Sequence, residues 1–128
     1  MDTAARLDLP ALRARASNDE ALVREVIEDF LRDADELLSA VVAGVGGGRF
    51  GEAARDAHRI RGALLALGAG PAAVAASALE AAACSLVAVA EPTGAQKNDV
   101  CGLLEAFRGC LEEARAEMRS YVGESSPI

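Results

Sequence analysis

The sequence predicts an all-α fold: an up-down-up-down four-helix bundle with a short additional N-terminal helix. Apolar residues recur at intervals of three and four over long stretches, and no stretch alternates apolar and polar residues as a half-buried strand does. Alanine, the residue with the highest helix propensity, is abundant throughout the chain. Glycine and proline gather at a few points that divide the chain into segments of helical length. Helices joined by such short connections are typical of a bundle.

The first two helices are predicted from their caps and their periodicity. A short helix is expected around Pro10–Ala16, with Asp8 as its N-cap. The first long helix follows the possible cap formed by Ser17 and Asn18, and it should end near Gly44 because three consecutive glycines come soon after. Its apolar stripe consists of Leu22, Val23, Val26, Ile27, Phe30, Ala34, Leu37, Leu38 and Val41.

Three further helices are expected in the rest of the chain. One runs from about Arg49 to Leu67 and ends at Gly68. Pro71 suits the first turn of the next helix, because proline is favoured where no backbone donor is needed. Residues 91–94 break the chain again. The apolar stripe of the last long helix consists of Val100, Leu103, Leu104, Phe107, Leu111, Ala114, Met118 and Val122.

The length of 128 residues supports one domain. We expect this domain to span residues 1–128, with an ordered core over about 8–122 and a flexible tail over 123–128. The first eight residues lack the apolar core of a signal peptide. The uncharged stretch 62–79 approaches the length of a membrane span, but Gly68–Pro71 interrupts it. We therefore expect a cytoplasmic, monomeric protein that does not enter the membrane.

Metal sites and disulfides are not expected. The three cysteines are Cys84, Cys101 and Cys110. They form no CxxC pair, so we expect them to be reduced and buried as small apolar side chains. Bundles that bind two metal ions need Glu-x-x-His motifs on two helices, and this chain has one histidine. The prediction is that the chain itself binds no metal and no cofactor.

The negative charge is concentrated in one part of the chain. Twenty acidic and thirteen basic side chains give a formal net charge of −7, which argues against a nucleic-acid partner. Residues 18–43 hold eight acidic and two basic residues, and these acids are most simply a solvated helix face. Residues 49–67 hold four arginines and two acids. This locally basic segment also contains the single histidine, His58.

His58 is predicted to point away from the core. On a helical wheel of about 100° per residue, Ile60 and Leu64 lie at about 180–240° from it and mark the buried stripe. The face of His58 carries Gly51, Ala54, Arg61, Gly62 and Leu65. A glycine inside a helix costs about 1 kcal/mol relative to alanine, so Gly62 is informative: it bares the backbone beside the imidazole and gives another protein room to approach.

Phosphoryl transfer through an imidazole matches these residues. Histidine side chains titrate near neutral pH, so a neutral ring with a nucleophilic lone pair is available. Such a ring can attack an activated phosphoryl group, such as an acyl phosphate, and pass it on. The ring must be exposed, because the donor and the acceptor are other proteins. Arg61, one turn away, offers a fixed positive charge to the transferred group.

The segment from Ala57 to Ala69 resembles the signature of histidine-containing phosphotransfer (HPt) domains. That signature runs histidine, any residue, leucine or isoleucine, lysine or arginine, glycine, a small residue, and a second glycine six positions after the first. The Leu79-Glu80 pair is similar to a Leu-Glu that often follows in the next helix. The family more often has lysine where Arg61 stands, and a small residue where Leu64 stands.

The resemblance implies a carrier without an ATP-binding kinase domain rather than an enzyme. His58 would accept the phosphoryl group, Arg61 would be its supporting cation and Gly62 would give clearance to the partner. The implied partners are response-regulator receiver domains or a hybrid histidine kinase, and the receiver supplies the aspartate and the magnesium. Residues near the ring are candidates for contact with the partner: Ala54, Arg55, Arg59 and Leu65. The competing interpretation is a helical adaptor that binds or sequesters a signalling partner and is never phosphorylated.

Overall fold

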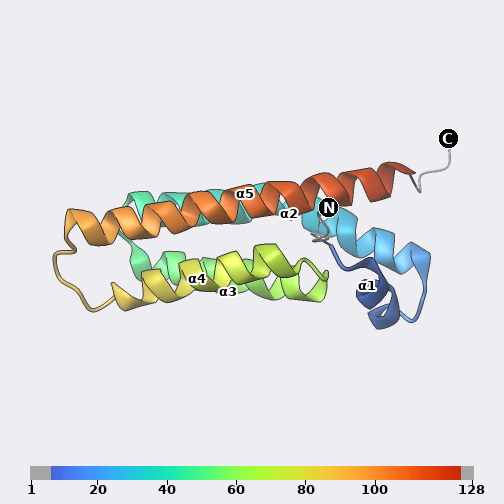
Figure 1. Cartoon of the computed structure of the whole chain (residues 1–128), viewed down its shortest axis with the longest axis horizontal. Coiled ribbons are helices and arrows are strands. Elements are labelled where there is room, and N and C mark those ends of the chain that lie inside the picture. The colour runs from blue at the N-terminus through green and yellow to red at the C-terminus, as the bar shows by residue number, and fades with distance from the viewer. Residues whose placement is uncertain (1–6, 125–128) are drawn as a thin grey trace, which may run out of the picture.

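The computed structural model describes residues 7–124, which form five helices and no strand. The helices are α1 (Leu9–Arg15), α2 (Glu20–Gly46), α3 (Phe50–Ala66), α4 (Gly70–Ser85) and α5 (Gly94–Glu124). Figure 1 shows the long helices α2 and α5 side by side as one layer over the α3–α4 hairpin, with α1 near the start of α2. Consecutive helices from α2 to α5 run in opposite directions, which confirms the predicted bundle with its short N-terminal helix.

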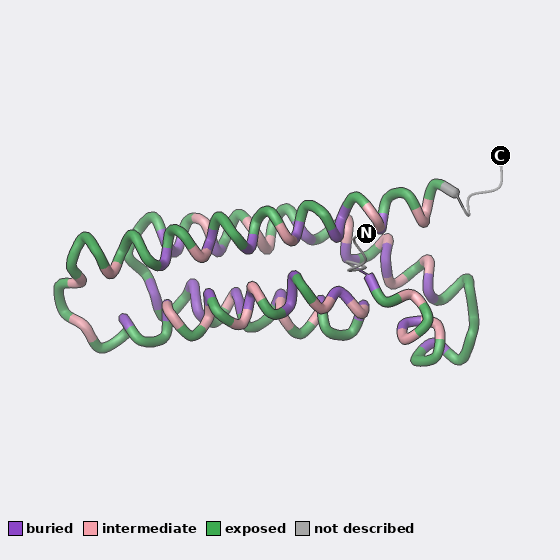
Figure 2. The backbone as a smooth tube through the Cα atoms, viewed as in Figure 1, coloured by how far each residue is buried: buried purple, intermediate pink, exposed green. Residues whose placement is uncertain are grey.

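The core lies between the two layers, where the buried stripes of α2, α3, α4 and α5 meet (Figure 2). Its largest fully buried side chains include Ile27, Ile60, Leu79, Phe107 and Met118. Alanine makes up half of the buried stripe of α3 and most of the buried stripe of α4, so these two helices approach each other closely. Among the described residues, no helix is both long and apolar enough to cross a membrane.

The helix caps agree with the sequence at α1 and differ at α2. Asp8 accepts a hydrogen bond from the backbone N–H of Ala11 at 3.1 Å, which confirms it as the N-cap of α1. The N-cap of α2 is Asp19 rather than Ser17 or Asn18. Those two residues have φ values of 55° and 59°, so they form the left-handed turn between α1 and α2 and cannot also cap the second helix.

The α2–α3 turn comes later than predicted. Helix α2 continues through Gly44 to Gly46, and Gly48 makes the turn with a φ of 74°. Gly44 is needed for packing rather than for termination, because a Cβ at that position would lie 3.2 Å from the Cβ of Ala53. Helix α3 agrees with its predicted limits to within one residue, and Pro71 lies in the first turn of α4 as expected.

One difference in bounds and one wrong prediction remain. Helix α5 continues to Glu124, two residues beyond the predicted end of the ordered core, and the rest of the predicted flexible tail, residues 125–128, lies outside the described residues. Cys84 and Cys101 are exposed and Cys110 is half-buried, whereas all three were expected in the core. Alanine, leucine and phenylalanine fill the α4 and α5 stripes, and the cysteines fall beside those stripes.

A polar cluster ties α1 to the ends of α2 and α5. The Arg13 Nε atom lies 2.7 Å from Glu20 Oε2, and the Tyr121 hydroxyl donates a hydrogen bond to the same carboxylate. The Arg13 guanidinium also lies 5.8 Å from the centroid of the Tyr121 ring. The Tyr121 hydrogen bond and the Arg13 ion pair lower the pKa of Glu20, and the bond to Glu20 raises the pKa of Tyr121.

This cluster predicts an acid-dependent loss of stability. Because the pKa of Glu20 is lowered in the folded chain, its contribution to stability is present above the ordinary carboxyl pKa and is lost as the pH falls through the folded value. Glu20→Gln should therefore destabilise the protein more at about pH 7 than at about pH 3. Urea denaturation of both proteins at the two pH values measures the difference, and an equal effect at both would show that the ionised form of Glu20 adds nothing to the stability of the fold.

Candidate functional site

Helix α3 presents His58 on the side opposite its core stripe. The buried residues of α3 are Phe50, Ala53, Ala54, Ala57, Ile60 and Leu64. The His58 side chain is 59% exposed in the middle of the helix, where the backbone is held by regular helical hydrogen bonds. The predicted exposure of His58 is confirmed. A ring in this position is accessible to another protein, while the helix fixes the position of the His58 backbone.

The His58 ring is held through one of its two nitrogens. Its Nδ1 atom lies 3.0 Å from Glu80 Oε2 of α4 and 2.8 Å from Arg61 Nη2. Arg61 Nε also lies 3.3 Å from Glu80 Oε1, so the three side chains form a closed triangle. Within residues 7–124, no hydrogen bond involves the other ring nitrogen, Nε2. The free Nε2 is therefore the atom placed to react with an incoming group.

Glu80 is the site residue that the sequence reasoning missed. The Leu79-Glu80 pair is part of the family resemblance, but the sequence predicts no role for the glutamate. Leu79 is fully buried, whereas Glu80 turns toward α3 and reaches both His58 and Arg61. A signal was present: Glu80 is the only charged residue in α4, so its carboxylate interrupts an otherwise apolar and small helix. A single charge in such a helix indicates a specific partner.

Gly62 leaves open space beside the ring. A Cβ built at this position would meet nothing within 4 Å, and the residue is exposed one turn after His58. No side chain therefore covers the backbone of α3 at this position, one turn after the histidine. Among the described residues, packing does not require glycine at this position, and its role in the approach of a partner stays a prediction.

The four candidate contact residues differ in their exposure. Arg55 and Arg59 are exposed, and Leu65 is 50% exposed. The predicted placement of Ala54 on the exposed face is wrong, because only 6% of it is accessible. Ala54 lies on the same side of α3 as Arg61, which reaches α4. Helix α3 packs against both α2 and α4. It therefore buries a wider arc of its surface than the single stripe that a helical wheel predicts.

The four arginines between residues 49 and 66 also differ in their ion pairs. Arg49 pairs with Glu52 at 3.2 Å, Arg59 with Asp56 at 3.7 Å, and Arg61 with Glu80. Among the described residues, nothing pairs with Arg55, which lies one turn before His58. Its charge is therefore free to meet an anionic partner, whereas the charge of Arg61 is shared with Glu80.

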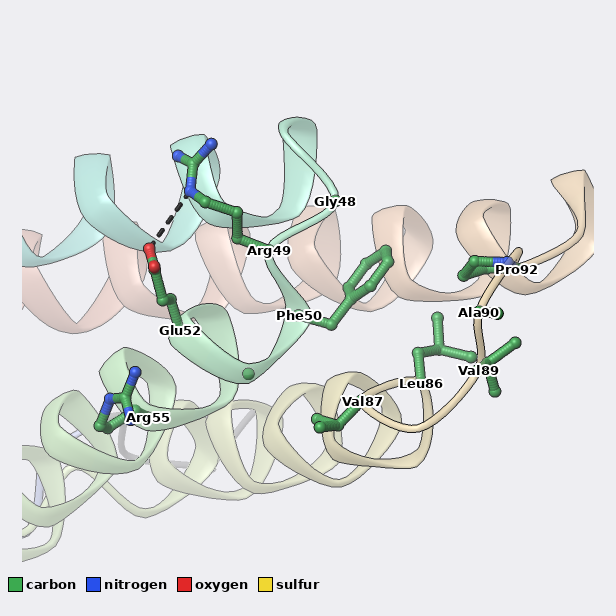
Figure 3. Close-up of a pocket in the computed structure, with 11 residues that line it drawn as sticks. Gly48, Arg49, Phe50, Glu52, Arg55, Leu86, Val87, Val89, Ala90 and Pro92 are labelled. Carbon is green, nitrogen blue, oxygen red and sulfur yellow. Dashed lines mark hydrogen bonds and ion pairs between the residues drawn. The ribbon is translucent and has the colours of Figure 1, made fainter.

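A cavity of about 380 Å³ lies at the start of α3, and its lining residues are drawn in Figure 3. Arg55 lines it together with apolar residues from the end of α4 and the following loop, of which Val87 is 57% exposed. His58 is not among its lining residues. In the part of the chain that the structure describes, no group of three or more histidine, cysteine or acidic side chains is arranged to hold a metal ion.

Comparison with known proteins gives one match. The Hpt domain family model matches residues 25–117. The matched segment begins in α2 and ends in α5, and it includes His58, Arg61, Gly62 and Glu80. No curated protein and no solved structure matches the chain.

Proposed function

The chain belongs to the Hpt domain family, and on that premise we propose that it is a phosphorelay intermediate. It accepts a phosphoryl group on His58 from a receiver-domain aspartate and passes it to another receiver aspartate. The observation that carries the proposal is the exposed ring held through Nδ1 alone, which leaves Nε2 free. In this role the chain is a carrier without a kinase activity of its own.

The transfer uses the lone pair of Nε2. This nitrogen attacks the phosphorus of the aspartyl phosphate on the receiver, a nitrogen–phosphorus bond forms, and the bond from phosphorus to the aspartyl oxygen breaks. The electron pair of the broken bond stays on the aspartate as a carboxylate. The proton on Nδ1 stays on the ring, where Glu80 accepts its hydrogen bond and offsets the positive charge that the ring gains. The second transfer is the reverse of this step with another receiver.

Other residues of α3 support the approach of the partner. Arg61 provides positive charge one turn from the ring, and Arg55 provides an unshared charge on its other side. Gly62 lets the receiver backbone come close, and Leu65 offers an apolar contact. The proposed partners are receiver domains, either free or within a hybrid histidine kinase. The Mg²⁺ that the reaction needs belongs to the receiver.

A direct test supplies phosphoryl groups and follows the chain. Receiver domains loaded with acetyl phosphate are mixed with the protein, and phosphoramidate serves as a small donor that needs no docking. The proposal predicts one phosphoryl group per chain from both donors, in a linkage that is labile to acid and stable to alkali. Absence of this linkage with phosphoramidate and with every receiver tried would contradict the proposal.

The adaptor function remains the second candidate, and the exposed apolar side chains of Leu65 and Val87 favour it. An adaptor would bind a receiver without acquiring a label. Its affinity would also survive His58→Gln, because binding would depend on the surrounding face and not on the ring. Equilibrium binding of the two proteins to one receiver, measured beside the labelling, separates the two functions.

A further inference from the structure

Two groups meet at one nitrogen of the His58 ring. The Nδ1 atom lies 2.8 Å from Arg61 Nη2 and 3.0 Å from Glu80 Oε2. A guanidinium only donates hydrogen bonds, and a carboxylate only accepts them. In a neutral imidazole, Nδ1 carries either a proton or a lone pair. It can therefore bond to Glu80 as a donor or to Arg61 as an acceptor, but never to both at once.

We propose that Arg61 is a brake on the reactivity of His58 and that Glu80 opposes it. Arg61 bonds only to the tautomer whose proton is on Nε2, and in this form Nε2 has no lone pair with which to attack phosphorus. Glu80 bonds to the tautomer whose proton is on Nδ1, and in this form the lone pair of Nε2 faces solvent. The inference rests on the proposed function, because phosphoryl transfer is what gives the two tautomers different consequences.

The contacts of Arg61 allow it to be displaced. Its Nε atom is buried and makes no hydrogen bond, although it lies 3.3 Å from Glu80 Oε1. The guanidinium therefore leaves one donor unsatisfied in its present position. The oxygens of an incoming phosphoryl group offer better acceptors. When they draw Arg61 away from Nδ1, Glu80 is the only partner left for that nitrogen.

The change of tautomer that releases the brake leaves the number of protons on the His58 ring unchanged. The ring passes the Nε2 proton to water and takes a proton from water on Nδ1, so its charge does not change. Glu80 then holds the Nδ1 proton while Nε2 attacks the phosphorus. Arg61 thus has two positions: against the ring at rest, and against the phosphoryl group during transfer. Glu80 acts as a positioning residue, since it touches the ring and not the transferred group.

The tautomer can be read without any phosphoryl donor. We suggest nitrogen NMR of the free full chain labelled with ¹⁵N-histidine, in a mildly alkaline buffer where imidazole groups are neutral. The chain has one histidine, so both ring signals belong to His58. Arg61→Met should raise the ratio of the Nδ1–H to the Nε2–H form by at least about fivefold, because it removes one hydrogen bond. Glu80→Leu should lower the ratio by a similar factor.

Arg55→Met and Glu52→Leu are the matched controls, because each removes the same kind of charge from α3 without a contact to the ring. The proposal is overturned if Arg61→Met and Glu80→Leu shift the ratio in the same direction, or by no more than these controls. A loss of folding would be visible in the amide spectrum, and Arg61→Gln then replaces Arg61→Met. The result is separate from phosphorylation, so a failure of either proposal is recognised by itself.

Discussion

His58→Gln is expected to abolish phosphoryl acceptance. Glutamine keeps a polar side chain of similar length on an exposed helix position, so the fold and its stability should change little. An amide nitrogen has no basic lone pair, so no nitrogen–phosphorus bond can form. Labelling by a phosphorylated receiver should fall by at least about 1,000-fold, which corresponds to about 4 kcal/mol of activation free energy. Intact-protein mass measured over time gives the extent of labelling.

Phosphorylation of a cysteine in place of His58 would also increase the protein mass, and Cys84 and Cys101 are exposed. Cys84→Ser and Cys101→Ser therefore serve as control variants, and both should be labelled as fully as the parent. Circular dichroism of His58→Gln should match the parent in helix content and melting temperature. If a correctly folded His58→Gln is labelled at the parental rate, the assignment of His58 as the acceptor is wrong.

Gly62→Trp is expected to block the receiver while leaving the ring chemically competent. A Cβ at this position meets nothing within 4 Å, so we expect the indole to project into the space through which the proposed partner approaches. Transfer from a phosphorylated receiver should fall by about 100-fold, equal to about 2.7 kcal/mol of activation free energy. Labelling by phosphoramidate, which needs no docking surface, should fall by no more than about threefold. Rates measured with both donors distinguish docking from chemistry.

A matched control comes from α5. Gly109 is also exposed inside a helix, and a Cβ there also meets nothing within 4 Å, but it lies on another helix of the bundle. Gly109→Trp should leave both rates close to those of the parent. Equal losses in the two variants would mean that tryptophan disturbs the protein in general. An unchanged receiver rate in Gly62→Trp would mean that the partner does not approach over Gly62.

The bundle could be predicted because its signals are local. The spacing of Ile27, Phe30, Ile60 and similar residues defines one buried stripe per helix, and Asp8 and Pro71 mark helix starts through backbone chemistry that needs no tertiary contact. The predicted N-cap of α2 is wrong because Asp19 and the two polar residues before it are all of types that favour the N-cap position. The local sequence does not decide which of these three residues caps the helix and which two form the left-handed turn.

The candidate site was predictable in part. The exposure of His58 and the open space at Gly62 depend on the angle of each residue around one helix, and a wheel describes that angle. The burial of Ala54 and the contacts of Arg61 depend on α4, whose position around α3 is a tertiary property. A helical wheel with one buried direction cannot show that Arg61 forms an ion pair with Glu80. What the sequence does not show is how α3 and α4 pack against each other, and the helix propensity of each segment does not supply it.

The charge pattern has a clearer meaning once the pairs are known. The excess of arginine between residues 49 and 66 is reduced by ion-pair partners of Arg49, Arg59 and Arg61, whereas Arg55 has no such partner among the described residues. The acidic chain thus presents a small positive area beside an exposed imidazole. Such an area suits an anionic partner site, whereas the formal net charge of −7 would repel it over longer distances.

Phosphorus–proton correlation NMR of the labelled chain shows whether Nε2 of His58 carries the phosphoryl group. The protein is labelled with phosphoramidate, and the single phosphorus signal is correlated with the ring protons of the only histidine. A phosphoryl group on Nε2 should couple to both carbon-bound ring protons, because both protons flank that nitrogen. A phosphorus signal coupled as on Nδ1, or attached to any other residue, would contradict the proposal that Nε2 carries the group.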